Sequence, residues 1–105
     1  MNVIESESLP QIGQVVRVLR GRDADKYAIV IAVEDQRFVR IADGDKRKFD
    51  TAKKKNILHL EAVDFISSEV QDSILQTGRV TNGKLRFALN KFKEECMDAQ
   101  DVKGE

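Results

Sequence analysis

The stretch from Gly13 to Leu60, GQVVRVLRGRDADKYAIVIAVEDQRFVRIADGDKRKFDTAKKKNILHL, decides the fold that we predict for this chain. It alternates short runs rich in β-branched residues with turn signals, a pattern typical of short strands. Five short strands in about 50 residues cannot build an extended sandwich, whereas closing them into a small barrel removes exposed sheet edges. We therefore predict a small β-barrel with strands at 13–19, 27–33, 38–42, 46–49 and 57–60.

Two local signals shape this prediction. The second strand is apolar from Ala28 to Val33, so we expect it to be covered on both faces. Asp43-Gly44 is the strongest turn signal, because both central residues of a type I′ turn need positive φ. We therefore pair 46–49 back on 38–42 and assign 50–56, with its three consecutive lysines, to a polar loop.

Beyond Leu60 the pattern changes to helical spacing. Ser68 with Gln71 fits a capping box and Gly78 fits a helix stop, which predicts a short helix over 68–77.

A second helix is predicted from an apolar stripe that is capped at Thr81 or Asn82. The stripe consists of Leu85, Ala88, Leu89, Phe92 and Cys96, all expected to be buried. Asn82-Gly83 also fits a hairpin turn within 79–96. We favour the helix because its apolar stripe extends further.

The net charge of zero conceals two oppositely charged parts. Residues 13–60 contain 12 Lys/Arg and 7 Asp/Glu, a net of +5, whereas the remainder contains 6 and 11, a net of −5. Because salt screens surface fields within about 10 Å, the local charge decides the partner. We expect the basic part to face a polyanion, and the acidic C-terminal part either to face away from it or to contact a basic protein nearby.

Length and composition predict one domain of 105 residues. We divide it into a flexible segment 1–11, a barrel 12–62, a helical appendage 63–97 and a polar tail 98–105. The acidic N-terminus does not resemble a signal peptide, and no apolar run is long enough to cross a membrane, so we expect a cytoplasmic protein without membrane contact.

Composition also argues against catalysis and cofactors. Cys96 and His59 are the sole cysteine and histidine, so we expect no disulfide and no metal site. No nucleophile or carboxylate set accompanies His59. We therefore expect no enzyme activity, no cofactor and no small-molecule substrate.

Three sequence blocks carry a family resemblance. They are Gly21-Arg22-Asp23, then Ile41-Ala42-Asp43-Gly44 with Arg47-Lys48, and then Lys53-Lys54-Lys55 leading to His59-Leu60. In this order, between Ile12 and Leu60, the chain resembles the bacterial KOW-motif RNA-binding proteins, relatives of KOW-type large-subunit ribosomal proteins of archaea and eukaryotes. The resemblance implies an SH3-like barrel; together with the strand and helix patterns above, this gives a mainly β fold with a five-stranded SH3-like barrel followed by two short C-terminal α-helices. It also implies RNA binding near the ribosome.

The candidate RNA contacts are cations of the barrel, because clustered cations attract phosphate and release counterions. They are Arg20, Arg22, Lys26, Arg40, Lys46, Arg47, Lys48, Lys53, Lys54 and Lys55. Tyr27 is the candidate for stacking on a base. Each of these side chains also fits an ordinary solvated surface.

Two functions fit these observations. The first is an RNA-binding protein of the translation machinery, with ribosomal RNA as the expected partner and ribosomal proteins as further neighbours. The alternative is a protein-interaction module that docks on a ribosomal or transcription complex. Association that resists ribonuclease would favour the alternative.

Overall fold

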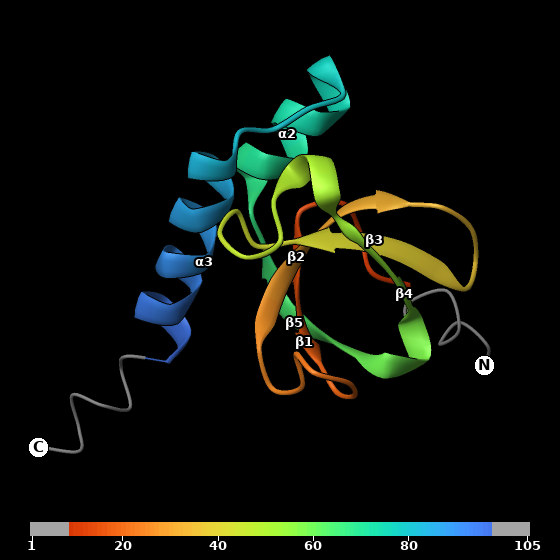
Figure 1. The fold of residues 1–105 in the computed structure, drawn as a ribbon. Coiled ribbons are helices and arrows are strands. Elements are labelled where there is room, and N and C mark those ends of the chain that lie inside the picture. The colour runs from red at the N-terminus through yellow and green to blue at the C-terminus, as the bar shows by residue number, and fades with distance from the viewer. Residues whose placement is uncertain (1–8, 98–105) are drawn as a thin grey trace, which may run out of the picture.

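The computed structural model describes residues 9–97, and it contains one sheet with two helices packed on it (Figure 1). The predicted segment 1–11, apart from its last three residues, and the predicted tail 98–105 lie outside the described residues. The strands are β1 (Gln14–Val18), β2 (Tyr27–Val33), β3 (Phe38–Ala42), β4 (Lys53–Asn56) and β5 (Leu60–Ile66). The helices are α2 (Ser68–Thr77) and α3 (Asn82–Cys96), with 3-10 turns at Phe49–Thr51 and Ile57–His59.

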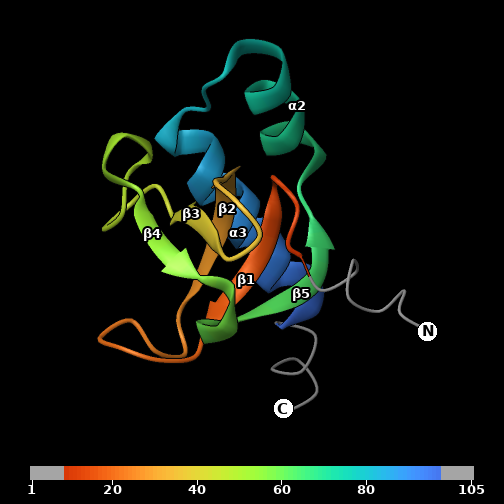
Figure 2. The same ribbon diagram turned by 90° about the vertical axis from the view of Figure 1, so that its right-hand side faces the viewer.

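The five strands form an antiparallel sheet in the order β4-β3-β2-β1-β5. Figure 2 shows the sheet curling, with β4 and β5 as its two edges. The ladders of β1 with β5 and of β2 with β3 each contain a register shift, and such bulges increase local strand bending. The predicted class, a mainly β fold with two C-terminal helices, is confirmed.

Hydrophobic residues fill both sides of the central strands. One cluster lies on the side of the sheet away from the helices and consists of Val16, Val18, Ala28, Val30, Val39, Ile41 and Leu60. The other lies between the sheet and the helices and includes Val15, Ile29, Ile31, Val70, Leu85 and Phe92. Burying such side chains contributes roughly 1.5–3 kcal/mol each. The expected coverage of β2 on both faces is confirmed.

Helix α2 begins and ends as predicted, but its cap differs from the prediction. Gly78 ends it in the left-handed conformation, at φ 81°. The cap is Ser67 rather than Ser68, because the Ser67 hydroxyl accepts a hydrogen bond from the Val70 amide at 3.2 Å. Gln71 does not complete a capping box. Its amide donates instead to the Ile12 carbonyl at 3.0 Å and ties α2 to the strand entrance.

Helix α3 confirms the helical alternative over the hairpin for 79–96. Thr81 caps it by accepting from the Lys84 amide at 3.1 Å. The stripe from Leu85 to Phe92 is buried as predicted. Cys96 is exposed, so its predicted burial is wrong. The hydrophobic cluster ends at Phe92, and the next turn of α3 does not belong to it.

The predicted strand 46–49 and its type I′ turn are wrong. Asp43 does not have the positive φ that this turn needs; within residues 9–97, Asp25 is the one non-glycine residue that has it. The Asp43 carboxylate instead accepts hydrogen bonds from the amides of Asp45 and Arg47, at 2.8 and 2.9 Å. These bonds shape a wide loop between β3 and β4.

The lysine run lies on a strand and not in a loop, contrary to our prediction. Lys53–Asn56 forms β4, which pairs with β3 at the sheet edge. Lysines are typical of edge strands, because their charge discourages further strand pairing. The predicted strand 57–60 is also displaced, since 57–59 is a 3-10 turn and β5 runs from Leu60 to Ile66.

The start of α3 is fastened to the β3–β4 loop. The Asn82 side chain accepts a hydrogen bond from the Phe49 amide at 2.8 Å. The Arg86 guanidinium donates to the Gly44 carbonyl at 2.6 Å. A Cβ on Gly44 would lie 2.4 Å from the Asn82 carbonyl oxygen, so the helix touches the loop backbone directly. This junction places one face of α3 beside the basic loops.

Candidate nucleic-acid interface

A concave site lies between the β1–β2 loop and the β3–β4 loop, with a volume of about 390 Å³. We call it the loop pocket. Five predicted RNA contacts lie around it, two from the first loop, two from the second and one from β4. They are Arg22, Lys26, Lys46, Arg47 and Lys53. The fold therefore brings together cations that are up to 31 positions apart in the sequence.

The loop pocket is positively charged, with five cations against two carboxylates, Asp23 and Asp43. Asp23 lies 3.7 Å from the Arg47 guanidinium. Asp43 is engaged by backbone amides of its own loop. The other four cations of the pocket have no ion-pair partner within residues 9–97. The pocket can therefore attract a phosphate without first breaking several salt bridges.

The three consecutive lysines do not face one way. Lys53 lines the loop pocket, whereas the Lys54 ammonium lies 3.6 Å from a Glu34 carboxylate oxygen and 4.8 Å from the centre of the Phe38 ring. Lys55 donates to the Arg20 carbonyl at 3.3 Å. Successive side chains of a strand point to opposite faces, so the run divides between two surfaces.

Arg40 and Lys54 belong to a separate cluster around Glu34. Arg40 is paired with Lys54 across β3 and β4, and its guanidinium also forms an ion pair with Glu34. The hydrogen bond from Arg40, and then the nearby charges of Arg40 and Lys54, hold the pKa of the Glu34 carboxyl below its ordinary value. This arrangement favours a structural role for both cations.

The Glu34 cluster predicts a pH effect. A carboxyl whose pKa is lowered on folding stabilises the fold fully above the unfolded pKa of about 4.3, and this contribution disappears as pH falls through the folded value. Glu34→Gln should therefore flatten the loss of stability below about pH 4. Urea-unfolding midpoints measured against pH test this, with Glu94→Gln as a control on α3. Identical acid profiles for Glu34→Gln and wild type would contradict the prediction.

The remaining predicted cations, Arg20, Lys48 and Lys55, do not line the loop pocket. Arg20 is exposed on the β1–β2 loop, beside Lys55. Lys48 is exposed on the β3–β4 loop, where its ammonium donates to the Asp45 carbonyl at 3.2 Å. Neither Arg20, Lys48 nor Lys55 has a salt bridge in the described part of the chain.

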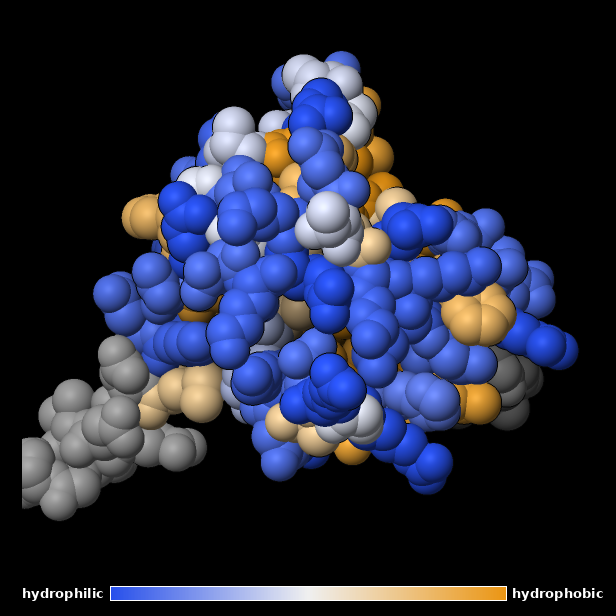
Figure 3. All heavy atoms as spheres, in the orientation of Figure 1, coloured by the Kyte–Doolittle hydropathy of each residue, from blue (hydrophilic) through white to orange (hydrophobic). Residues whose placement is uncertain are grey.

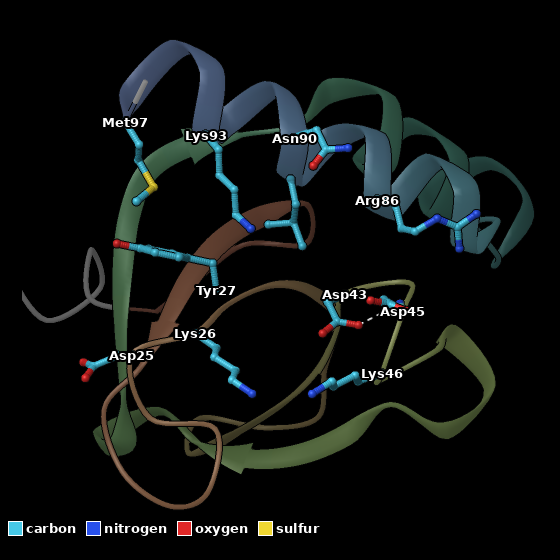
Figure 4. A pocket seen from close by; sticks show the side chains of 11 residues that line it. Asp25, Lys26, Tyr27, Asp43, Asp45, Lys46, Arg86, Asn90, Lys93 and Met97 are labelled. Atoms are coloured by element: carbon cyan, nitrogen blue, oxygen red, sulfur yellow. Dashed lines mark hydrogen bonds between the residues drawn. The ribbon is translucent and has the colours of Figure 1, made fainter. Parts of the chain in front are cut away.

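A second cavity, of about 600 Å³, adjoins the first and lies under α3 (Figure 4). We call it the helix groove. Figure 4 shows Arg86, Asn90, Lys93 and Met97 along the side of α3 that borders it, with the two loops opposite. Sequence reasoning missed these residues, because the acidic C-terminal part was expected to face away. The spacing of Arg86, Asn90 and Lys93 beside the buried stripe was the available signal.

Tyr27 lies where the two cavities meet and lines both. Its ring is half-buried, and its centre lies 5.1 Å from that of Phe92. The predicted stacking residue therefore forms part of the wall between α3 and the barrel.

Other kinds of site find no support in the part of the chain that the structure describes. Residues 9–97 contain no cluster of His, Cys, Asp and Glu side chains suited to a metal ion. Neither described helix has the length and hydrophobicity needed to span a membrane. The face seen in Figure 3 is mostly hydrophilic.

Comparison with known proteins defines the class. The KOW motif matches residues 12–41, which run from just before β1 to β3 and include Arg22 and Lys26 of the loop pocket. A Bacillus subtilis protein, named "Putative ribosome-binding protein YbzG", is 46% identical over 71 residues. That match covers 68% of this chain and 96% of the Bacillus protein. The chain therefore belongs to the bacterial KOW-motif family.

More distant relatives occur in fungi. The protein "Genetic interactor of prohibitins 3, mitochondrial" is 32% identical over 80 residues in Candida albicans and 34% identical over 80 residues in Candida dubliniensis. Each match covers 76% of this chain but 10% of the fungal protein. This sequence likeness is thus confined to a small part of much longer proteins.

Proposed function

We propose that this protein binds RNA at the ribosome, in the cytoplasm, and contacts the phosphate backbone through the loop pocket. The observation that carries this proposal is the convergence of five cations from three chain segments on one concave site. Membership of the KOW family and the name of the Bacillus relative support the ribosome as the location. The proposed role is binding, and it requires no cofactor and no reaction.

Recognition would depend on RNA shape more than on base sequence. Cations in the loop pocket neutralise phosphates, and the released counterions drive binding. Side chains cannot read the deep, narrow major groove of A-form RNA, so contacts with phosphates and 2′-hydroxyls dominate on paired regions. A folded RNA that presents closely spaced phosphates, such as ribosomal RNA, is the matching partner.

The loop pocket is tested with the double variant Lys46→Ala/Lys53→Ala. Charged hydrogen bonds contribute about 1.5–3 kcal/mol each, so we expect the loss of two to lower affinity for ribosomes by roughly 100-fold or more. The slope of log affinity against log salt should decrease by about one for each phosphate that is no longer neutralised. Sedimentation with Bacillus subtilis ribosomes over a salt series measures both.

The matched control is Lys54→Ala, which removes a lysine of the same run that lies at Glu34 and outside the loop pocket. It should leave affinity and salt slope nearly unchanged. An equal loss in the control and the double variant would contradict the assignment of the pocket. Association that survives ribonuclease would instead favour the protein-interaction alternative, for which the exposed side chains of Phe87 and Leu75 are candidate contacts.

A further inference from the structure

The helix groove has a different chemistry from the loop pocket beside it. We infer that it receives one unpaired nucleotide base of the bound RNA, while the adjoining phosphate lies in the loop pocket. This inference rests on the proposed function, because it names the feature of the RNA that the same site selects.

The size and lining of the helix groove fit a base. Its volume of about 600 Å³ falls within the range of small-ligand pockets, roughly 300–1,000 Å³. Leu89, Met97 and the Tyr27 ring provide apolar and aromatic surface, and the Asn90 amide provides both a donor and an acceptor. Unstacked bases are bound by this combination of aromatic contact and edge hydrogen bonding.

The charges of the two cavities separate phosphate from base. The helix groove has four cations against three carboxylates, so its charges nearly cancel, whereas the loop pocket has five against two. A phosphate is therefore favoured in the loop pocket. The carboxylates of Asp25, Asp43 and Asp45 would repel a phosphate in the helix groove, but they do not repel a neutral base. In addition, Asp25 is paired with Arg17 at 2.7 Å, and Asp43 is held by loop amides.

The cavities are connected at the residues that they share, which are Lys26, Tyr27, Asp43 and Lys46. Figure 4 shows Lys26 and Lys46 extending from the two loops, with Tyr27 between Lys26 and α3. A nucleotide whose phosphate is bound by these lysines can thus place its base under α3. Bases within a regular duplex stay stacked and paired, so only an unpaired nucleotide can do this.

The test uses two synthetic RNA duplexes that are identical except that one carries a single unpaired 2-aminopurine nucleotide. We expect the wild-type protein, at low salt, to bind the bulged duplex about 10-fold more tightly, as base stacking on an aromatic predicts. We also expect the 2-aminopurine fluorescence to change on binding. Asn90→Leu removes the edge hydrogen bonds and keeps the Tyr27 ring, so it should weaken the preference for the bulged duplex and leave binding to the regular duplex unchanged.

Gln76→Leu is the matched control, because it also replaces a side-chain amide by leucine, at an exposed position of α2 outside the groove. It should behave like wild type. If wild type binds both duplexes equally and the fluorescence does not change, the inference is wrong while the proposed RNA binding stands. If wild type binds neither duplex, both proposals fail. Tyr27→Leu is a second test variant. It should lose the preference for the bulged duplex and bind the regular duplex as tightly as wild type.

Discussion

Gly44→Ala is expected to lower the free energy of unfolding by about 2–5 kcal/mol, because two effects add. Gly44 has a φ of 82°, where a side chain is strained. An added Cβ would also lie 2.4 Å from the Asn82 carbonyl oxygen and 3.0 Å from the Leu85 Cβ. Either the β3–β4 loop or the first turn of α3 must move. Urea unfolding followed by circular dichroism measures the change.

Gly78→Ala separates the two effects. Gly78 has nearly the same φ, 81°, but an added Cβ would meet no atom within 4 Å. Its replacement should therefore cost only the backbone strain, about 1–2 kcal/mol. If both variants lose the same stability, the close approach between α3 and the loop does not contribute.

The junction at Gly44 also positions the helix groove. Arg86 donates to the Gly44 carbonyl, and Asn82 holds the Phe49 amide. A variant that remains folded but shifts this contact would move Arg86 and Asn90 away from the loops. The close contact at Gly44, together with the buried stripe of α3, thus sets the distance between α3 and the β3–β4 loop.

Sequence patterns predicted the central part of the fold well. Strands β2 and β3 and helix α2 have the predicted bounds, because β-branched runs and helical spacing reflect burial directly. The errors in strand placement occur between Asp43 and Ile66. There, the local hairpin signal at Asp43-Gly44 is overridden by side-chain bonds within the loop and by contact with α3. Strand β4 carries no hydrophobic alternation, since KKKN gains its strand structure from pairing with β3.

The candidate site could be predicted from the sequence only in part. The basic character of the barrel loops is visible in the sequence, but the directions of Lys53 and Lys54 depend on a strand that was not predicted. The contribution of α3 depends on how the helix crosses the loops. This placement depends on contacts between residues far apart in the sequence, such as those of α3 with Gly44 and with the buried residues of β1 and β2.

Phe92→Ala is expected to have the other large effect. Phe92 is 3% exposed, and its ring centre lies 5.1 Å from that of Tyr27 and 5.5 Å from that of Phe65. Removing a buried aromatic ring costs about 3–5 kcal/mol, through lost burial and the cavity that remains. A small domain has a total stability of about 5–15 kcal/mol, so the variant should be close to unfolding. Thermal and urea unfolding measure the loss.

Phe87→Ala is the matched control on the same helix. Its side chain is 57% exposed, so the replacement should cost less than about 1 kcal/mol. The two variants also differ in function, because Phe92 supports the Tyr27 ring and Phe87 does not line the helix groove. Under conditions where both are folded, Phe92→Ala should lose the preference for bulged RNA and keep its affinity for the regular duplex. Equal unfolding midpoints for the two variants would mean that α3 does not depend on this aromatic cluster for its position.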